Sequence, residues 1–216
     1  MEKNDGGKSV FEQLAPHPPQ PPIKSTSKAG RNLKAAVPTA VVLLALVALS
    51  IVWRLELFAV LVAVAVCIGL WEIAGAFLAK KVRIPIVPLW VGAITMVVAT
   101  WFEGLGGGLI AFLLSIAAVF LWCVLDGASR APRDVMAAIF ALAWIALLGC
   151  FAVALLSLDD PVWKVGLLIL MPVANDTGGW AFGVVWGKHP MSPSISPKKS
   201  WEGFAGSVVC GLAVAM

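Results

Sequence analysis

The sequence is poor in charged residues. Only 13% of its 216 residues are Asp, Glu, Lys or Arg, whereas about 25% of a typical soluble domain is charged. Apolar residues make up 60%, and they lie in long runs rather than at the spacing of an amphipathic helix. A soluble core cannot hide that much apolar surface. The composition therefore excludes a soluble globular protein and predicts an all-α, polytopic membrane protein with one integral domain.

Paired cysteines and clustered histidines are also missing. The four cysteines (Cys67, Cys123, Cys150 and Cys210) all fall inside apolar runs, and none belongs to a C-x-x-C pair. This spacing argues against a disulfide framework or a zinc site and favours small, soft packing residues. Of the two histidines, His17 is expected to be solvated in the N-terminal tail, and His189 is expected in a loop at the membrane surface.

The N-terminal tail, residues 1–34, is polar and rich in proline. Such a segment cannot bury enough apolar area to offset the entropy of ordering, so we expect it to be disordered. No short apolar run with a small-residue cleavage site follows, so it is not a typical secretory signal peptide. Residues 35–216 are then the membrane domain.

Six apolar stretches in this domain are long enough to span a bilayer, which needs about 20 residues. They are predicted near 35–53, 55–79, 84–101, 105–125, 135–156 and 161–186. A seventh begins near 203 and has only about 14 residues before Met216. We therefore expect six complete spans, the start of a seventh, and a C-terminally truncated chain.

Basic residues predict the orientation of these spans. With the tail in the cytoplasm, fourteen of the sixteen Lys and Arg residues fall on the cytoplasmic side, and only Arg54 and Lys164 fall outside. This is the positive-inside pattern, so the formal charge of +4 reflects topology and not affinity for nucleic acid. The prediction is a multi-pass protein of the plasma membrane whose N-terminus and 187–203 loop are cytoplasmic.

Asp176 is the first candidate for chemistry, because a carboxylate among membrane-spanning residues is costly and by default marks a functional site. Its neighbours Asn175, Thr177, Gly178 and Gly179 are poor helix formers, so we expect the sixth span to break or loosen here. Irregular backbone at membrane depth is tolerated where it lines a cavity. Asp176 would then contact a ligand or metal; the alternative is a helix kink with Asp176 paired to a neighbouring span.

The second candidate is the basic loop after this span. Ser196-Pro197 resembles an N-cap followed by proline at the first helical position, which would place Lys198 and Lys199 in the first turn of the last helix. Two cations at the positive end of a helix dipole favour a docked anion such as a phosphate. A juxtamembrane patch that touches acidic lipid headgroups explains the lysines equally well.

The roles of two glutamates remain open. Glu202, at the start of the last span, could ligate a cation or hold a lysine, or could simply favour the helix dipole. Glu72 lies inside the second span, where contact with substrate and pairing with another span are equally plausible.

Three blocks in fixed order, DTGGWAFG at 176–183, GKH at 187–189 and SPKKSWEG at 196–203, resemble the phosphatidate cytidylyltransferases (CDP-diacylglycerol synthases), especially their actinobacterial branch. Trp71-Glu72 is also similar to the family. The resemblance implies transfer of CMP from CTP to phosphatidic acid with release of pyrophosphate, Mg²⁺ as cofactor, and a homodimer. The family's later signature loop, rich in lysine and aspartate, would lie beyond Met216.

On this resemblance we assign roles to residues. Lys198 and Lys199 would bind phosphate, Asp176 would position metal or nucleotide, and Ser196 and Glu202 would shape the helix start; Asp176, Lys198, Lys199 and Glu202 form the catalytic group. The expected substrate-binding residues are Asn175, Thr177, Gly178, Lys188, Ser196, Ser200 and Glu72. The alternatives are a transporter with a broken-helix substrate site, a non-catalytic membrane scaffold and a lipid kinase that uses CTP.

Overall fold

The computed structural model describes residues 15–19, 33–126, 131–192 and 196–216. These residues are helical apart from loops and one short two-stranded hairpin, so the predicted all-α class is confirmed. The chain divides into two compact units, Met1–Ser157 and Leu158–Met216.

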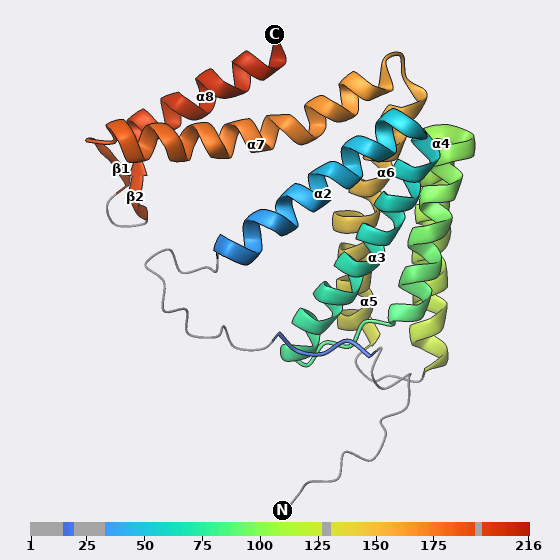
Figure 1. Ribbon diagram of the computed structural model, residues 1–216. Helices are drawn as coiled ribbons and strands as arrows, with labels where there is room; N and C mark the ends of the chain where they lie inside the picture. Colours follow the sequence, from blue (N-terminus) through green and yellow to red (C-terminus); the bar gives the residue numbers. More distant parts are fainter. Residues whose placement is uncertain (1–14, 20–32, 127–130, 193–195) are drawn as a thin grey trace, which may run out of the picture. The chain divides into compact units, whose positions relative to one another are not determined.

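The first unit is a set of long apolar helices, labelled in Figure 1. They are α2 (Leu33–Trp53), α3 (Leu55–Ala79), α4 (Ile86–Leu125), α5 (Ala131–Ala141), a π-helical stretch (Leu142–Leu147), α6 (Leu148–Ala154) and a 3₁₀ turn (Leu155–Ser157). Helices suit these sequences because they satisfy every backbone polar group within the segment. The centre of the unit is formed by the fully buried Leu70, Leu89, Met96, Val119 and Leu142.

Helix α4 is two helices joined at Gly104. This glycine has φ 67° and ψ −167°, a conformation that side-chain-bearing residues rarely adopt, and the chain reverses there. The two halves pack closely, since a Cβ at Gly92 would lie 2.6 Å from Ser115 Oγ. Figure 1 shows them side by side. The two halves of α4 correspond to the predicted stretches 84–101 and 105–125, which meet at the reversal at Gly104.

The expected number of spans is not reached. Within the described residues, four helical segments are long and apolar enough to cross a membrane: Leu55–Ala79, Ile86–Leu125, Pro132–Ser157 and Pro161–Trp186. The predicted first span, 35–53, lies within α2 (Leu33–Trp53), of which Pro38–Trp53 is classed as a shorter apolar helix. The predicted seventh corresponds to another short apolar helix, Trp201–Ala215. The prediction of six complete spans is thus too high by this measure.

Part of the N-terminal tail lies against α3. Residues 15–19 are described, and the His17 ring centroid is 6.4 Å from that of Trp71. The His17 carbonyl oxygen sits where a Cβ of Gly75 would be, 2.2 Å away, so glycine permits this approach. His17 itself is exposed, as expected. The rest of the tail prediction, over 1–14 and 20–32, lies outside the described residues.

The second unit contains two apolar helices and the hairpin between them. Its elements are α7 (Pro161–Trp186), β1 (Pro190–Ser192), β2 (Ser196–Ser200) and α8 (Trp201–Ala215). The strands pair antiparallel, with Pro190 opposite Ser200 and Ser192 opposite Ser196. Because the hairpin reverses the chain, α8 runs back along α7 in the opposite direction (Figure 1).

Candidate functional site

Helix α7 runs unbroken through residues 175–179, so the predicted break in this span is wrong. The glycines serve close packing instead. A Cβ at Gly178 would lie 2.7 Å from both Cys210 Sγ and the Gly206 carbonyl oxygen, and a Cβ at Gly179 would lie 2.4 Å from Ser207 Oγ. Small residues at such a crossing let two backbones approach, which is how apolar helices associate in lipid. Tertiary contact with α8 thus overrides the poor helix propensity.

We call this crossing the glycine seam, formed by Gly178, Gly179, Gly183, Gly203 and Gly206. One hydrogen bond reinforces it, from the Ser207 hydroxyl to the Asn175 carbonyl oxygen at 2.8 Å.

Helix α8 begins four residues later than expected. Ser196–Ser200 forms β2, and the N-cap is Ser200, whose Oγ accepts a hydrogen bond from the Gly203 N–H at 3.1 Å. The prediction of Ser196 as N-cap, with both lysines in the first helical turn, is therefore wrong. Pairing of β2 with β1 keeps residues 196–200 extended, and Ser200 provides the competing cap.

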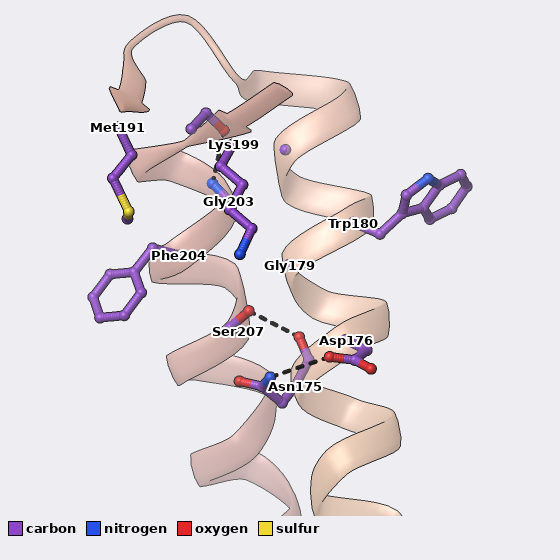
Figure 2. A pocket seen from close by; sticks show the side chains of 11 residues that line it. Asn175, Asp176, Gly179, Trp180, Met191, Lys199, Gly203, Phe204 and Ser207 are labelled. Atoms are coloured by element: carbon purple, nitrogen blue, oxygen red, sulfur yellow. Dashed lines mark hydrogen bonds between the residues drawn. The ribbon is translucent and has the colours of Figure 1, made fainter. Parts of the chain in front are cut away.

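A pocket of about 490 Å³ lies along the part of the seam formed by Gly179, Gly183 and Gly203. Its lining comes from α7, the hairpin and α8: Asn175, Asp176, Gly179, Trp180, Gly183, Met191, Lys199, Ser200, Gly203, Phe204 and Ser207. Figure 2 shows α7 and α8 side by side at the pocket, with the Trp180 ring pointing away from α8. This volume lies within the range of small-molecule sites, about 300–1,000 Å³.

The pocket joins the two candidate segments of the sequence. Lys199 extends from β2 toward the end where Asn175, Asp176 and Ser207 lie (Figure 2). Asn175 Nδ2 donates to the Asp176 carboxylate at 3.3 Å, and no described residue forms an ion pair with Asp176. The side chains of Asp176 and Lys199 are both exposed to solvent. One cation and one carboxylate therefore belong to the lining of the same pocket.

Glu202 is held by His189 instead of lining the pocket. His189 Nδ1 is 2.6 Å from Glu202 Oε1, and the His189 backbone N–H donates to Oε2 at 3.3 Å. The His189 ring lowers the pKa of the Glu202 carboxyl to about 2, with help from the backbone N–H groups of Glu202, His189 and Lys188. Glu202 therefore accepts hydrogen bonds from His189. Its side chain is not part of the pocket lining, so the geometry gives no support to its predicted catalytic role.

The remaining predicted residues whose side chains the structure describes lie outside the pocket lining. Gly178 is buried in the seam, Thr177 and Lys188 are exposed, and Ser196 lies at the start of β2. Lys198 belongs to β2, and its side chain falls outside the described part of the structure. Glu72 is exposed on α3, in the other unit.

Sequence reasoning missed the residues of α8 that complete the pocket, Ser207 and Phe204, and the partner role of His189. A signal for the seam was available. Gly179, Gly183 and Gly187 recur every four residues, which places them on one face of a helix, and Gly203 and Gly206 follow at helical spacing. The glutamate–histidine pair had no comparable signal, because the hairpin register decides it.

The described residues contain no group of three or more His, Cys, Asp or Glu side chains placed to hold a metal ion. The pocket offers one carboxylate, from Asp176, and one amide oxygen, from Asn175. Mg²⁺ is commonly bound by one or two carboxylates together with substrate phosphates and water. The donor set therefore fits a Mg²⁺ that arrives with a phosphorylated substrate, and does not fit a cage made of protein ligands alone.

The chain resembles known proteins over most of its length. A sequence model described as the cytidylyltransferase family matches residues 34–216. A phosphatidate cytidylyltransferase of Mycobacterium bovis is 34% identical over 230 aligned positions, which cover 100% of this chain and 75% of that protein. The enzyme of the same name from Mycobacterium leprae is 33% identical over 204 positions, covering 87% of this chain and 65% of that protein. One from Staphylococcus saprophyticus is 48% identical over 42 positions, 19% of this chain and 16% of that protein. No solved structure matches the chain.

Proposed function

Since the chain belongs to the cytidylyltransferase family, we propose that it transfers CMP from CTP to phosphatidic acid, giving CDP-diacylglycerol and pyrophosphate. The observation that carries the site assignment is the pocket that collects Lys199, Asn175 and Asp176 from two separate segments. A nucleoside triphosphate needs a cation and an open, partly polar space of this kind.

The reaction requires two anions to meet. A phosphate oxygen of phosphatidic acid attacks the α-phosphorus of CTP, the bond between that phosphorus and the bridging oxygen breaks, and pyrophosphate leaves with the electron pair. The nucleophile is already anionic at neutral pH, so the site needs no general base. Its task is to offset charge repulsion and to align the two phosphates.

Lys199 and the Asn175–Asp176 pair divide this task. The Lys199 ammonium binds phosphate oxygens of CTP, and Lys198, its neighbour in β2, adds a second positive charge to the same strand. Asp176 and Asn175 would hold a Mg²⁺ that arrives with the substrate, and this ion would supply neutralisation of phosphate charge and polarisation at phosphorus. Ser200 keeps the helix start in place next to Lys199. The substrate contacts assigned to Thr177, Lys188, Ser196 and Glu72 stay predictions.

The proposed lipid substrate resides in a membrane. The protein is a multi-pass membrane protein with four helices long and apolar enough to span. We propose that the reversal at Gly104 and the short helices add further crossings, toward the six predicted, with the N-terminus and the β1–β2 hairpin on the cytoplasmic side, where CTP is found. Labelling of Ser192→Cys with an impermeant thiol reagent in intact cells tests whether the β1–β2 hairpin faces the cytoplasm. The homodimer stays a prediction, testable by cross-linking in membranes.

The transporter alternative depended on a broken sixth span, and α7 is continuous. A lipid kinase that uses CTP would bind the same nucleotide but form a different product. Analysis of the lipid product separates the two, because the proposed reaction yields a CDP-lipid and a kinase yields a phosphorylated lipid.

The test measures CDP-diacylglycerol formation by the purified full chain in mixed micelles with CTP, phosphatidic acid and Mg²⁺. Lys199→Ala and Asp176→Asn should each lower kcat/KM about 10- to 100-fold, the effect of losing one interaction with a charged group. Lys164→Ala and Asp160→Asn, at the other end of α7, are the matched controls and should keep activity. Full turnover in both pocket variants would contradict the site assignment, and absence of any CDP-lipid with the wild type would contradict the reaction.

A further inference from the structure

We propose that His189 and Glu202 are positioning residues, whose hydrogen-bonded pair fixes the β1–β2 hairpin to the first turn of α8 and thereby holds Lys199 over the pocket. The inference rests on the proposed function for its kinetic consequences and on the geometry alone for its structural ones. We call this pair the hairpin latch.

Three hydrogen bonds join one residue before the hairpin to the helix after it. The Trp201 N–H donates to the His189 carbonyl oxygen at 3.0 Å. In the opposite direction, the His189 N–H reaches Glu202 Oε2 at 3.3 Å, and its ring Nδ1 lies 2.6 Å from Oε1. His189 therefore uses its carbonyl, its amide and its side chain on two consecutive residues. The hairpin, whose second strand carries Lys199, is thus fixed at both of its ends, at His189 and at Trp201-Glu202.

Neither packing nor helix electrostatics alone explains the pair. The His189 side chain is 78% exposed and that of Glu202 is 25% exposed, so the contact buries little apolar surface. A carboxylate that only favoured the helix dipole would need no histidine. Glu202 is also not part of the pocket lining, whereas Lys199, three residues earlier, is.

A latch is useful because lysine is flexible. Its long side chain has many rotamers, and a mobile strand would add backbone freedom that CTP binding must remove. Fixing the strand beforehand removes part of that entropic penalty. The latch should therefore act on the binding of the nucleotide more than on the chemical step.

The structural test is hydrogen–deuterium exchange of the wild-type chain and of Glu202→Gln, read on peptides that cover residues 188–203. Exchange in these peptides should become about three- to fivefold faster in the variant, the effect of losing one exposed ion pair. Peptides from α3 should not change. This readout needs no activity, so it stands even if the proposed reaction fails. Unchanged exchange over 188–203 would overturn the latch.

The kinetic test uses four variants in the cytidylyltransferase assay. His189→Ala and Glu202→Gln should raise the KM for CTP about three- to fivefold with kcat nearly constant. His189→Asn keeps an N–H donor close to the Nδ1 position and should restore most of the loss. His17→Ala, which changes the only other histidine of the chain, is the control and should behave as wild type.

The strongest discrimination comes from the Lys199→Ala background. There His189→Ala should have little further effect, because the residue that the latch positions is already gone. Full additivity of the two losses, or a collapse of kcat at unchanged KM in Glu202→Gln, would overturn the positioning role.

Discussion

Replacement of Gly178 by alanine should weaken the packing of α7 against α8, whereas the same change at Gly166, on the same helix, should stabilise the protein. A Cβ at Gly178 would lie 2.7 Å from Cys210 Cβ, Cys210 Sγ and the Gly206 carbonyl oxygen. A backbone oxygen cannot rotate away, so the two helices must separate. A Cβ at Gly166 meets nothing within 4 Å.

The expected magnitude follows from two opposing effects. Alanine favours a helix over glycine by about 1 kcal/mol at either position. Overpacking at Gly178 costs about 1–3 kcal/mol against this gain. The net result is a loss of about 0–2 kcal/mol in the free energy of unfolding for Gly178→Ala and a gain of about 1 kcal/mol for Gly166→Ala. The two variants should thus differ by about 1–3 kcal/mol.

The assay is reversible unfolding of the purified chain by SDS in mixed micelles, followed by far-ultraviolet circular dichroism, with both variants measured beside the wild type. The comparison is sharp because the same substitution in the same helix changes sign with its surroundings. Equal stabilisation by both alanines would refute the seam, since it would mean that Gly178 loosens the helix as its propensity alone suggests.

Two further predictions concern the start of α8. Ser200→Ala should lower the free energy of unfolding by about 1 kcal/mol, because Ser200 Oγ accepts a hydrogen bond from the Gly203 N–H. Ser196→Ala should change the free energy of unfolding by less than about 0.5 kcal/mol. The same SDS titration measures both variants, and a larger loss for Ser196→Ala would place the cap at Ser196. The pKa of Glu202 is lowered from 4.5 to about 2, so its contribution to stability should be complete above pH 4.5 and be lost as the pH falls toward 2. Melting curves of wild type and Glu202→Gln over this range should converge on acidification, and a constant gap would contradict the shift.

Close agreement between sequence and structure is found where hydrophobicity alone decides. The limits predicted for the second and sixth spans, 55–79 and 161–186, are those of α3 and α7. Long apolar runs have few alternatives to helix, because their backbone polar groups must be satisfied internally. Cys67, Cys123, Cys150 and Cys210 are free thiols in the structure.

Errors arose where a neighbouring segment changes the meaning of a residue. Glycines at 178 and 179 were interpreted as a helix break because propensity considers one helix at a time, and α8 turns the same residues into a packing surface. Ser196-Pro197 has the chemistry of a helix start, yet strand pairing with β1 keeps it extended and moves the start to Trp201.

The sequence by itself determined the class, the family and the residue types of the site, since composition, apolar run length and the three motif blocks are properties of the linear chain. Only the tertiary structure decided that Asn175, Asp176 and Lys199 share one pocket and that Glu202 belongs to His189. The physical reason is that these relations depend on the close approach of α7 to α8 and on the register of the hairpin. Both are set by contacts between separate segments of the chain, which the propensity of a single segment does not contain.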